Sequence, residues 1–471
     1  MRTILIVTTG TRDVQIKKSA SFNQYEKKFI YRTSQGEARS IQVFYQEDFP
    51  EVLFLSSVRE GCLRLYEDFE HVKHDILFPM IDAAVKFVLK EKSSIDVIVF
   101  IVTDQEGSGA EEKHVKRDTV NLPPLAEKFL CENYAESIKD YHSYKVTEKL
   151  TDIDFWFDRF DEEVRNKNIY PDPEEEASIY FLPQGGIDQI NQALTLKLIE
   201  NYPQLKLIQI SEGKEPRILD FPRKFIQNIT RLKAVEMAKH FRFAQVGLLN
   251  FAKDREIEML SNLGKVLMQL DYSTLKDLAD RNDYIRLSEK VNTVRNIFDL
   301  WAHDEDSRNI LLYLTAKVHY YNKSAEEMLW RLFTLYEQLI KARVADLLEW
   351  HNDDSYAFFE AIRLNEKLYN HLIDRFNGKI EPRRHVYEAI LCFFNENIND
   401  IRPIQILRER RNELLHSGLG LSMEKVNKLL EQHKINLDNL FENRLDRRFG
   451  VSGFGLLGEL RDEILKRLGV V

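Results

Sequence analysis

Residues 408–418, RERRNELLHSG, bring together side chains that could cleave a phosphodiester bond. Arg411 and His416 are separated by four residues, and Asn412 lies one helical turn before His416. An arginine can stabilise a crowded anionic phosphate, and a histidine can move or orient protons. If the 2′-hydroxyl of RNA is the nucleophile, this chemistry needs no metal ion. The segment is therefore a candidate site for RNA cleavage.

The helix that carries this segment sets the geometry of the pair. Pro403 and Gly418 predict its start and end, so that His416 lies in the last turn, where the helix dipole favours a protonated imidazole. Arg411 lies five residues earlier, about 140° around a regular helix. One chain alone would thus hold the two groups on different faces. A twofold axis could bring two arginines and two histidines around one phosphate.

The spacing by itself is unspecific. An arginine followed after four to six residues by a histidine also occurs at Arg410, with five residues between, and at Arg64 and His71, with six between, in the other half of the chain. A solvated helix end is the alternative interpretation of RERRNELLHSG.

The first half of the chain alternates strand and helix patterns. Helical patterns at 77–93 and 187–202 lie between apolar runs that predict strands. Near-continuous apolar strands of this kind favour an α/β domain with a mainly parallel sheet covered by helices. Ligands of such sheets bind beyond the carboxyl ends of the strands. The predicted strands are 3–10, 51–57, 96–104, 178–186 and 205–211.

Three of these strands end in loops rich in glycine, hydroxyl and amide groups: TTGTRD, TDQ and PQGGIDQIN. None of the loops is a P-loop or a dinucleotide-binding G-x-G-x-x-G turn. Their groups suit ribose, phosphate oxygens and base edges better than acid–base chemistry, although a glycine turn can also be only a tight turn. The expected ligand contacts are Thr8, Thr9, Gly10, Thr11, Arg12, Asp13, Thr103, Asp104, Gln105, Gln184, Gly185, Gly186, Asp188, Gln189 and Asn191.

Two further segments of this half are expected to have structural roles. Asp118 or Thr119, just before a predicted helix, is expected to cap that helix, which is compatible with ligand contact. The acidic stretch 151–176 is expected to be a solvated insertion. A metal site is not expected there, because no histidine accompanies its carboxylates at ligand spacing.

From about residue 226 the pattern becomes helical throughout, with few glycines before Gly418. The boundary between the halves is expected near 220–225.

The net charge of −9 belongs to residues 1–225, which hold 30 Lys and Arg against 39 Asp and Glu; the rest holds 37 of each. An acidic chain is poorly suited to bind duplex DNA, which favours a basic protein surface. Three scattered cysteines fit a reducing cytoplasm, and no apolar run is long enough to span a membrane.

The combination of motifs resembles the CARF–HEPN ribonucleases of type III CRISPR systems, the Csm/Csx group. The resemblance rests on TTGT, TDQ…RDT and LPQGG in an α/β half followed by RNELLH in a helical half. Residues 231–249, RLKAVEMAKHFRFAQVGLL, look like the helical segment that follows the CARF domain in that family. The resemblance covers essentially the whole chain, although its motifs are short. It implies a Rossmann-like CARF domain over 1–225, a helical connecting segment over 226–300 and an all-helical HEPN domain over 301–471.

The resemblance also implies a function. The CARF domain would bind cyclic oligoadenylate, with the tetramer favoured over the hexamer, and thereby activate a metal-independent endoribonuclease that degrades single-stranded RNA. Arg411, Asn412 and His416 match the family's catalytic motif. A cytoplasmic homodimer is expected, with no cofactor, no membrane association and no stable DNA binding. Some CARF domains also cleave their activator, and no residue here decides that point.

Two alternatives belong to other classes. One is a CARF-containing regulator, gated by its ligand, whose helical half is catalytically inert; the intact Arg and His pair argues against it. The other is a nucleotide-dependent oxidoreductase, which the absent dinucleotide fingerprint disfavours.

Overall fold

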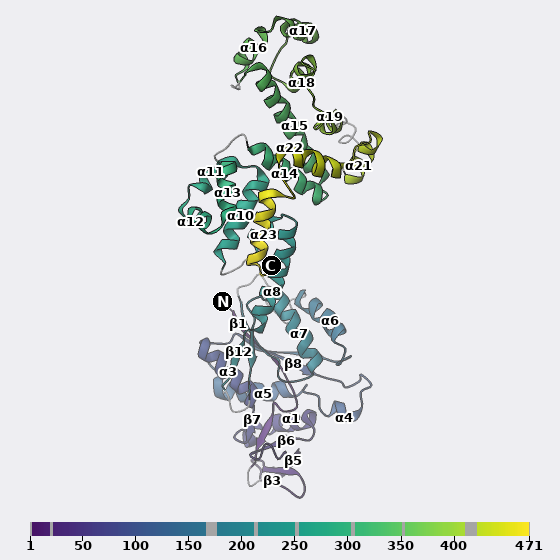
Figure 1. The fold of residues 1–471 in the computed structure, drawn as a ribbon. Coiled ribbons are helices and arrows are strands. Elements are labelled where there is room, and N and C mark those ends of the chain that lie inside the picture. The colour runs from purple at the N-terminus through teal and green to yellow at the C-terminus, as the bar shows by residue number, and fades with distance from the viewer. Residues whose placement is uncertain are drawn as a thin grey trace. The chain divides into compact units, whose positions relative to one another are not determined.

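The computed structural model describes residues 2–18, 22–165, 177–211, 215–249, 254–302, 307–350, 354–409 and 422–470. The chain divides into two compact units, Met1–Ile229 and Thr230–Val471. The first is built on sheets and the second is helical (Figure 1). Within the described ranges, no helix is both long and apolar enough to span a membrane.

The main sheet of the first unit has six strands in the order β12-β11-β10-β1-β8-β9. β1 (Arg2–Thr8), β8 (Val97–Thr103), β9 (Tyr141–Val146), β10 (Ala177–Leu182) and β11 (Lys206–Gln209) run parallel, and β12 (Arg217–Leu219) is antiparallel at one edge. The central strands are buried along nearly their whole length, as expected of strands covered on both faces. The predicted mainly parallel sheet is confirmed.

Helices cover both faces of this sheet. On one face, Leu5 and Val7 pack in a core with α3 (Pro79–Glu91) and α5 (Leu122–Tyr134). On the other face, a second core holds α6 (Ile153–Arg165) and α7 (Asp188–Asn201). Alternate residues of β1 therefore contact different helix layers. The shorter helices of this unit are α1 (Val58–Glu67), α2 (Phe69–Val72) and α4 (Glu112–Val115).

A second, antiparallel sheet corrects part of the sequence prediction. Its order is β3-β4-β5-β6-β2-β7, and β6, predicted at 51–57 as a strand of the main sheet, belongs to it. Most of its strands are short or only half-buried, so they carry little apolar pattern to reveal them. They are β2 (Gln15–Lys17), β3 (Phe22–Asn23), β4 (Lys28–Arg32), β5 (Ala38–Phe44), β6 (Val52–Leu55) and β7 (Ile76–Leu77).

The expected solvated insertion at 151–176 is wrong for its first part. Residues 153–165 form α6, and Trp156 and Phe160 bury one face of that helix against the main sheet. Their i, i+4 spacing is the apolar stripe of an amphipathic helix. The high acidic content of the segment concealed it. Residues 166–176 lie outside the described ranges.

The second unit, apart from the residues not described, consists of helices around one core. Helices α14 (Arg308–Tyr321) and α15 (Ala325–Leu348) pack against each other, and both contribute buried residues to that core. Helix α8 (Phe221–Lys239) contains the boundary between the units. The remaining helices are α9 (Phe243–Leu248), α10 (Arg255–Gln269), α11 (Tyr272–Ala279), α12 (Asn282–Lys290), α13 (Asn292–Ile297), η1 (Phe298–Ala302), α16 (Ser355–Arg363), α17 (Glu366–Phe376), α18 (Arg384–Phe393), α19 (Arg402–Glu409), α21 (Met423–Gln432), η2 (Asn439–Leu445), α22 (Asp446–Phe449) and α23 (Gly455–Arg467).

Candidate functional site

Sheet order brings the three predicted loops together. β1 lies between β10 and β8, and all three strands run parallel. Their carboxyl ends, Thr8, Leu182 and Thr103, therefore meet at one edge of the sheet. This is the place where parallel α/β sheets bind ligands.

The glycines of two loops pack against each other. A Cβ atom on Gly10 would lie 2.6 Å from the Gly186 nitrogen, and one on Gly185 would lie 2.5 Å from Asp13 Oδ2 and closer still to the Thr8 carbonyl oxygen. Neither position leaves room for a side chain. At Gly10 and Gly185, the glycine is thus required by contact between the two loops, and not only by close approach of a ligand.

Asp13 stabilises the first of these two loops through a hydrogen bond to Gly10. Its carboxylate is buried and accepts a hydrogen bond from the Gly10 backbone N–H at 2.7 Å. Burial raises the pKa of Asp13 to about 7, although the Gly10 N–H partly offsets that effect. The Asp13 carboxylate is therefore a structural part of the turn.

Three threonine hydroxyls form the floor between the first and middle loops. Thr9 and Thr119 bond each other through their hydroxyls at 2.7 Å. The backbone N–H groups of Thr103 and Thr119 each donate to the other residue's hydroxyl. Thr9 Oγ1 also lies 3.0 Å from the Ile101 carbonyl oxygen. The bonding capacity of these hydroxyls is largely used within the protein.

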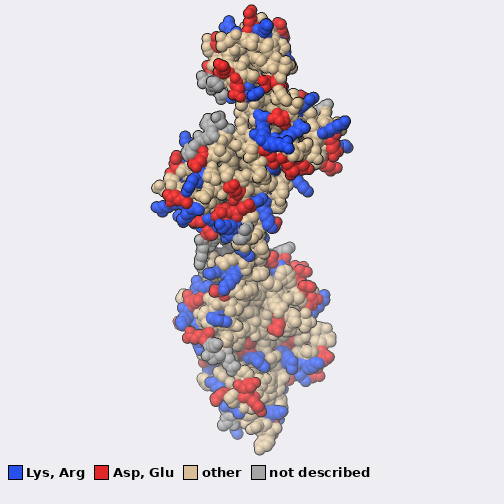
Figure 2. All heavy atoms as spheres, in the orientation of Figure 1, with Lys and Arg blue, Asp and Glu red and all other residues tan. Residues whose placement is uncertain are grey.

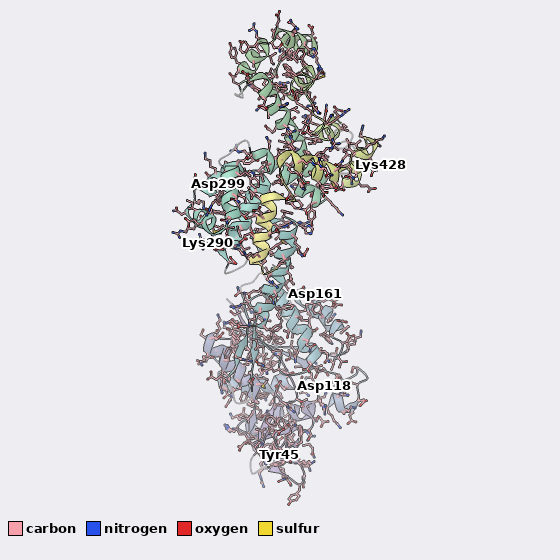
Figure 3. All side chains as sticks on the ribbon, in the orientation of Figure 1. Tyr45, Asp118, Asp161, Lys290, Asp299 and Lys428 are labelled. Carbon is pink, nitrogen blue, oxygen red and sulfur yellow. The ribbon has the colours of Figure 1, made fainter. Side chains whose placement is uncertain are left out.

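Asp118 anchors the middle loop and does not cap a helix. It is fully buried and accepts hydrogen bonds from Gln105 N (2.6 Å), Gln105 Nε2 (2.8 Å) and Arg59 (3.2 Å). The following helix, α5, begins later, with Asn121 before its first residue. The prediction of a cap at Asp118 or Thr119 is wrong, because both side chains are bound across the loop. Figure 3 marks Asp118 in the first unit.

Arg59 joins this anchor to further acids. It contacts Asp104, Asp118 and Glu106. Burial opposes ionisation of Asp104, but hydrogen bonds from Arg59 and Lys145 outweigh burial and lower the pKa of Asp104. Asp104, expected to contact a ligand, forms ion pairs with both Arg59 and Lys145.

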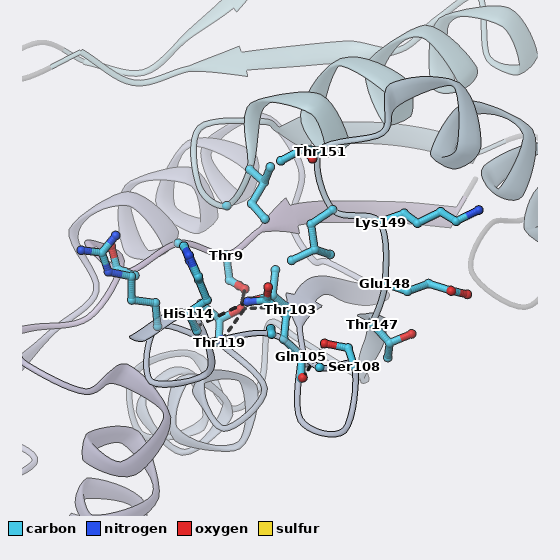
Figure 4. A pocket seen from close by; sticks show the side chains of 18 residues that line it. Thr9, Thr103, Gln105, Ser108, His114, Thr119, Thr147, Glu148, Lys149 and Thr151 are labelled. Carbon is cyan, nitrogen blue, oxygen red and sulfur yellow. Dashed lines mark hydrogen bonds between the residues drawn. The ribbon is translucent and has the colours of Figure 1, made fainter. Parts of the chain in front are cut away.

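The three loops border a cavity of about 740 Å³ (Figure 4). Six expected ligand residues line it: Thr9, Gly10, Thr11, Thr103, Gln105 and Gly186. The remaining lining residues come mainly from the middle loop and from the segment that follows β9, and they are not among the ligand contacts expected from the sequence. These lining residues are Ser108, Gly109, Ala110, His114, Arg117, Thr119, Thr147, Glu148, Lys149, Leu150, Thr151 and Ile187.

The other expected ligand residues lie around the cavity without lining it. Thr8 Oγ1 contacts the Leu182 carbonyl, Gln184 bonds the backbone of Ile210, and the buried Asn191 donates to the Gly185 carbonyl. These three support the loops. Arg12 and Asp188 are exposed, and Gln189 is half-buried in the first turn of α7; the supporting roles of Asp13, Asp104 and Gly185 are described above.

The candidate catalytic residues Arg411, Asn412 and His416 lie outside the described residues, which end at Glu409 before this segment. Arg408, in the last turn of α19, is mostly buried, pairs with Glu337 and lies over the Tyr336 ring. Arg64 and His71 contact the backbone of Ser40 and Ser34 respectively, as structural residues do. The described ranges contain no group of three or more His, Cys, Asp or Glu side chains that could hold a metal ion.

Comparison with known proteins shows a shared fold but no matching sequence family. No protein-family model and no curated protein sequence matches this chain. The chain does share the fold of Enterococcus italicus Csm6, solved bound to cyclic hexa-2′-fluoro-hexa-dAMP. The similarity covers 99% of this chain and 100% of that one, with a TM-score of 0.56 and 12% sequence identity. An α/β unit followed by a helical unit is therefore an architecture that this chain has in common with Csm6.

Proposed function

We propose that the chain is a CARF–HEPN effector, in which a cyclic oligoadenylate bound by the first unit activates an endoribonuclease in the second. The observation that carries the proposal is the convergence of three strand-end loops on one cavity, in a chain whose whole length matches the fold of a protein solved with a cyclic oligonucleotide. The loops include the TTGT and LPQGG segments on which the family resemblance rests.

The proposed nuclease chemistry uses the chain's own residues. Arg411 would stabilise the phosphate that carries the developing charge, and His416 would move or orient protons, with Asn412 beside it. The RNA supplies the 2′-hydroxyl. Cleavage should then leave 2′,3′-cyclic phosphate ends, continue in EDTA and spare DNA, which lacks the nucleophile.

A homodimer is part of the proposal. Two copies of the arginine and histidine pair would be needed around one phosphate, and a ring-shaped ligand suits a pocket shared across a twofold axis. Light scattering at micromolar concentration should give the mass of two chains. A fully active monomer would contradict this part.

The test is degradation of single-stranded RNA in EDTA with and without synthetic cyclic tetra-adenylate or cyclic hexa-adenylate. We expect a ring of one size, with the tetramer as our choice, to accelerate cleavage strongly. Binding of a ring without any RNA cleavage would favour the ligand-gated regulator instead. Absence of both binding and cleavage would overturn the proposed function.

A further inference from the structure

We infer that the phosphates of the activator are held on one side of the cavity, by Arg117 and His114 of the middle loop. This inference rests on the proposed function, since it names contacts within the same pocket. Both residues are exposed, and both line the cavity. Neither belongs to the glycine loops that the sequence makes conspicuous.

Several other polar groups of the pocket are already bonded within the protein. The Gly10 N–H donates to Asp13, and Gln105 gives its backbone and side-chain donors to Asp118. Ser108 donates to the Gln105 carbonyl, and the floor threonines bond one another. A ligand that took these groups would first have to break those bonds, which costs free energy.

Most cations near the cavity are already paired with carboxylates. Arg59 is held by three carboxylates and Lys145 by Asp104. Lys113 and Lys116 pair with Glu111 and Glu112.

The side chains of Arg117 and His114 differ from these cations. Over the described ranges, neither has a carboxylate within 4.0 Å. They are thus available to an anion. The Arg117 guanidinium is always charged and offers several N–H donors, so Arg117 is the stronger of the two contacts.

The two sides of the cavity differ in how well they suit an anion. Figure 4 shows His114 and Lys149 on opposite sides of the threonine floor. The Lys149 side chain runs away from that floor, and its ammonium lies 4.3 Å from the centroid of the Phe155 ring. Its neighbour Glu148 adds a negative charge to that side. The side that follows β9 is therefore the less favourable one for phosphate.

The wall that carries the two cations is held in place by the backbone. The Lys116 carbonyl oxygen accepts hydrogen bonds from Val58 N and Arg59 N at the start of α1. One residue after Arg117, the buried Asp118 is bonded to Gln105 and Arg59. Arg117 is thus presented from a segment fixed on either side of it, which lowers the ordering cost of binding. By this argument Arg59 is a positioning residue.

The test is binding of cyclic tetra-adenylate and cyclic hexa-adenylate to the full-length chain by calorimetry, at low and moderate salt. We expect Arg117→Gln to weaken binding of the preferred ring by about 10-fold to 100-fold, the usual loss for one charge-assisted hydrogen bond, and to weaken its salt dependence. His114→Gln should have a smaller effect, because an imidazole offers fewer N–H donors than a guanidinium.

Two matched variants serve as controls. Lys113→Gln removes a cation one residue from His114, and Lys149→Gln removes one from the opposite side of the cavity. Each should change the dissociation constant less than about twofold, because the charge is either screened by a paired carboxylate or points away from the ligand. Equal losses in all four variants would overturn the inference in favour of a nonspecific charge effect. Wild-type affinity in both Arg117→Gln and His114→Gln, with the wild-type chain binding normally, would overturn it while leaving the proposed function intact. No binding by the wild-type chain would overturn both.

Discussion

In the α/β unit the candidate site is assembled from segments far apart in the sequence, whereas in the helical unit the candidate catalytic residues lie within the six positions 411–416. The α/β site depends on strand order, which places Gly10 beside Gly185 and Thr9 beside Thr119. The helical motif depends on local spacing and, in our proposal, on a second copy of the chain. Mutations should therefore act differently in the two units: through folding and affinity in the first, and through rate in the second.

Surface charge distinguishes the two units less clearly than the arrangement of their candidate sites does. Figure 2 shows acidic and basic side chains interspersed on the visible face of the first unit. The available positive charge in that unit's cavity comes from individual side chains, not from a broad basic surface. This agrees with a small anionic ligand better than with a long nucleic acid.

The largest effect is expected in the helical unit. His416→Ala should lower the rate of RNA cleavage at least ~100-fold, the usual loss for an acid–base group. Arg411→Ala should behave likewise because it removes charge stabilisation. Calorimetry should show unchanged affinity for the cyclic oligoadenylate in both variants. Full activity of His416→Ala would show that RERRNELLHSG is only a helix end.

The next largest effect should come from adding a methyl group where the two glycine loops contact each other. Gly185→Ala should lower the free energy of unfolding by about 3 kcal/mol, the upper end of the overpacking range, because the new Cβ meets the backbone of Thr8 and the Asp13 carboxylate. The matched control is Gly107→Ala. No atom lies within 4 Å of its Cβ position, so that only its positive φ, at about 1 kcal/mol, opposes the change. Equal losses in urea titrations of the two variants would contradict the loop contact.

A pH effect should follow from Asp13. Its pKa is raised from the ordinary 3.8 to about 7, so the folded state retains the proton that the unfolded state loses between these values. The wild type should therefore lose stability relative to Asp13→Asn as pH rises from 5 to 8, by on the order of 2–3 kcal/mol. Urea titrations at the two pH values measure the difference. A constant difference would mean that Asp13 titrates normally.

The smallest effect is expected at Arg408. It lies three residues before Arg411 but is mostly buried and pairs with Glu337, so Arg408→Ala should reduce stability by roughly 0.5–1 kcal/mol. The rate of RNA cleavage by the folded variant should stay near that of the wild type. A loss of rate as large as that of Arg411→Ala would place Arg408 in the chemistry.

The sequence predicts some parts of this molecule well, for physical reasons. β1, β8 and β10 are continuous apolar strands, so both the strands and the loops at their ends were predictable. β9, with the sequence YHSYKV, lies at a sheet edge and is mostly polar, so neither it nor the wall that follows it was found. The roles of Asp104 and Asp118 depend on Arg59, 45 and 59 residues away, and no local pattern reports such a contact.

The most direct measurement of the central claim is the rate of RNA cleavage in EDTA as a function of activator concentration, for the wild type, Arg117→Gln and His416→Ala. We expect Arg117→Gln to raise the half-saturating activator concentration by at least about 10-fold but to reach the wild-type rate at saturation. We expect His416→Ala to lower the saturated rate without moving the half-saturating concentration. A reduced saturated rate with unchanged half-saturation in Arg117→Gln, or cleavage that is independent of any cyclic oligoadenylate, would contradict the account.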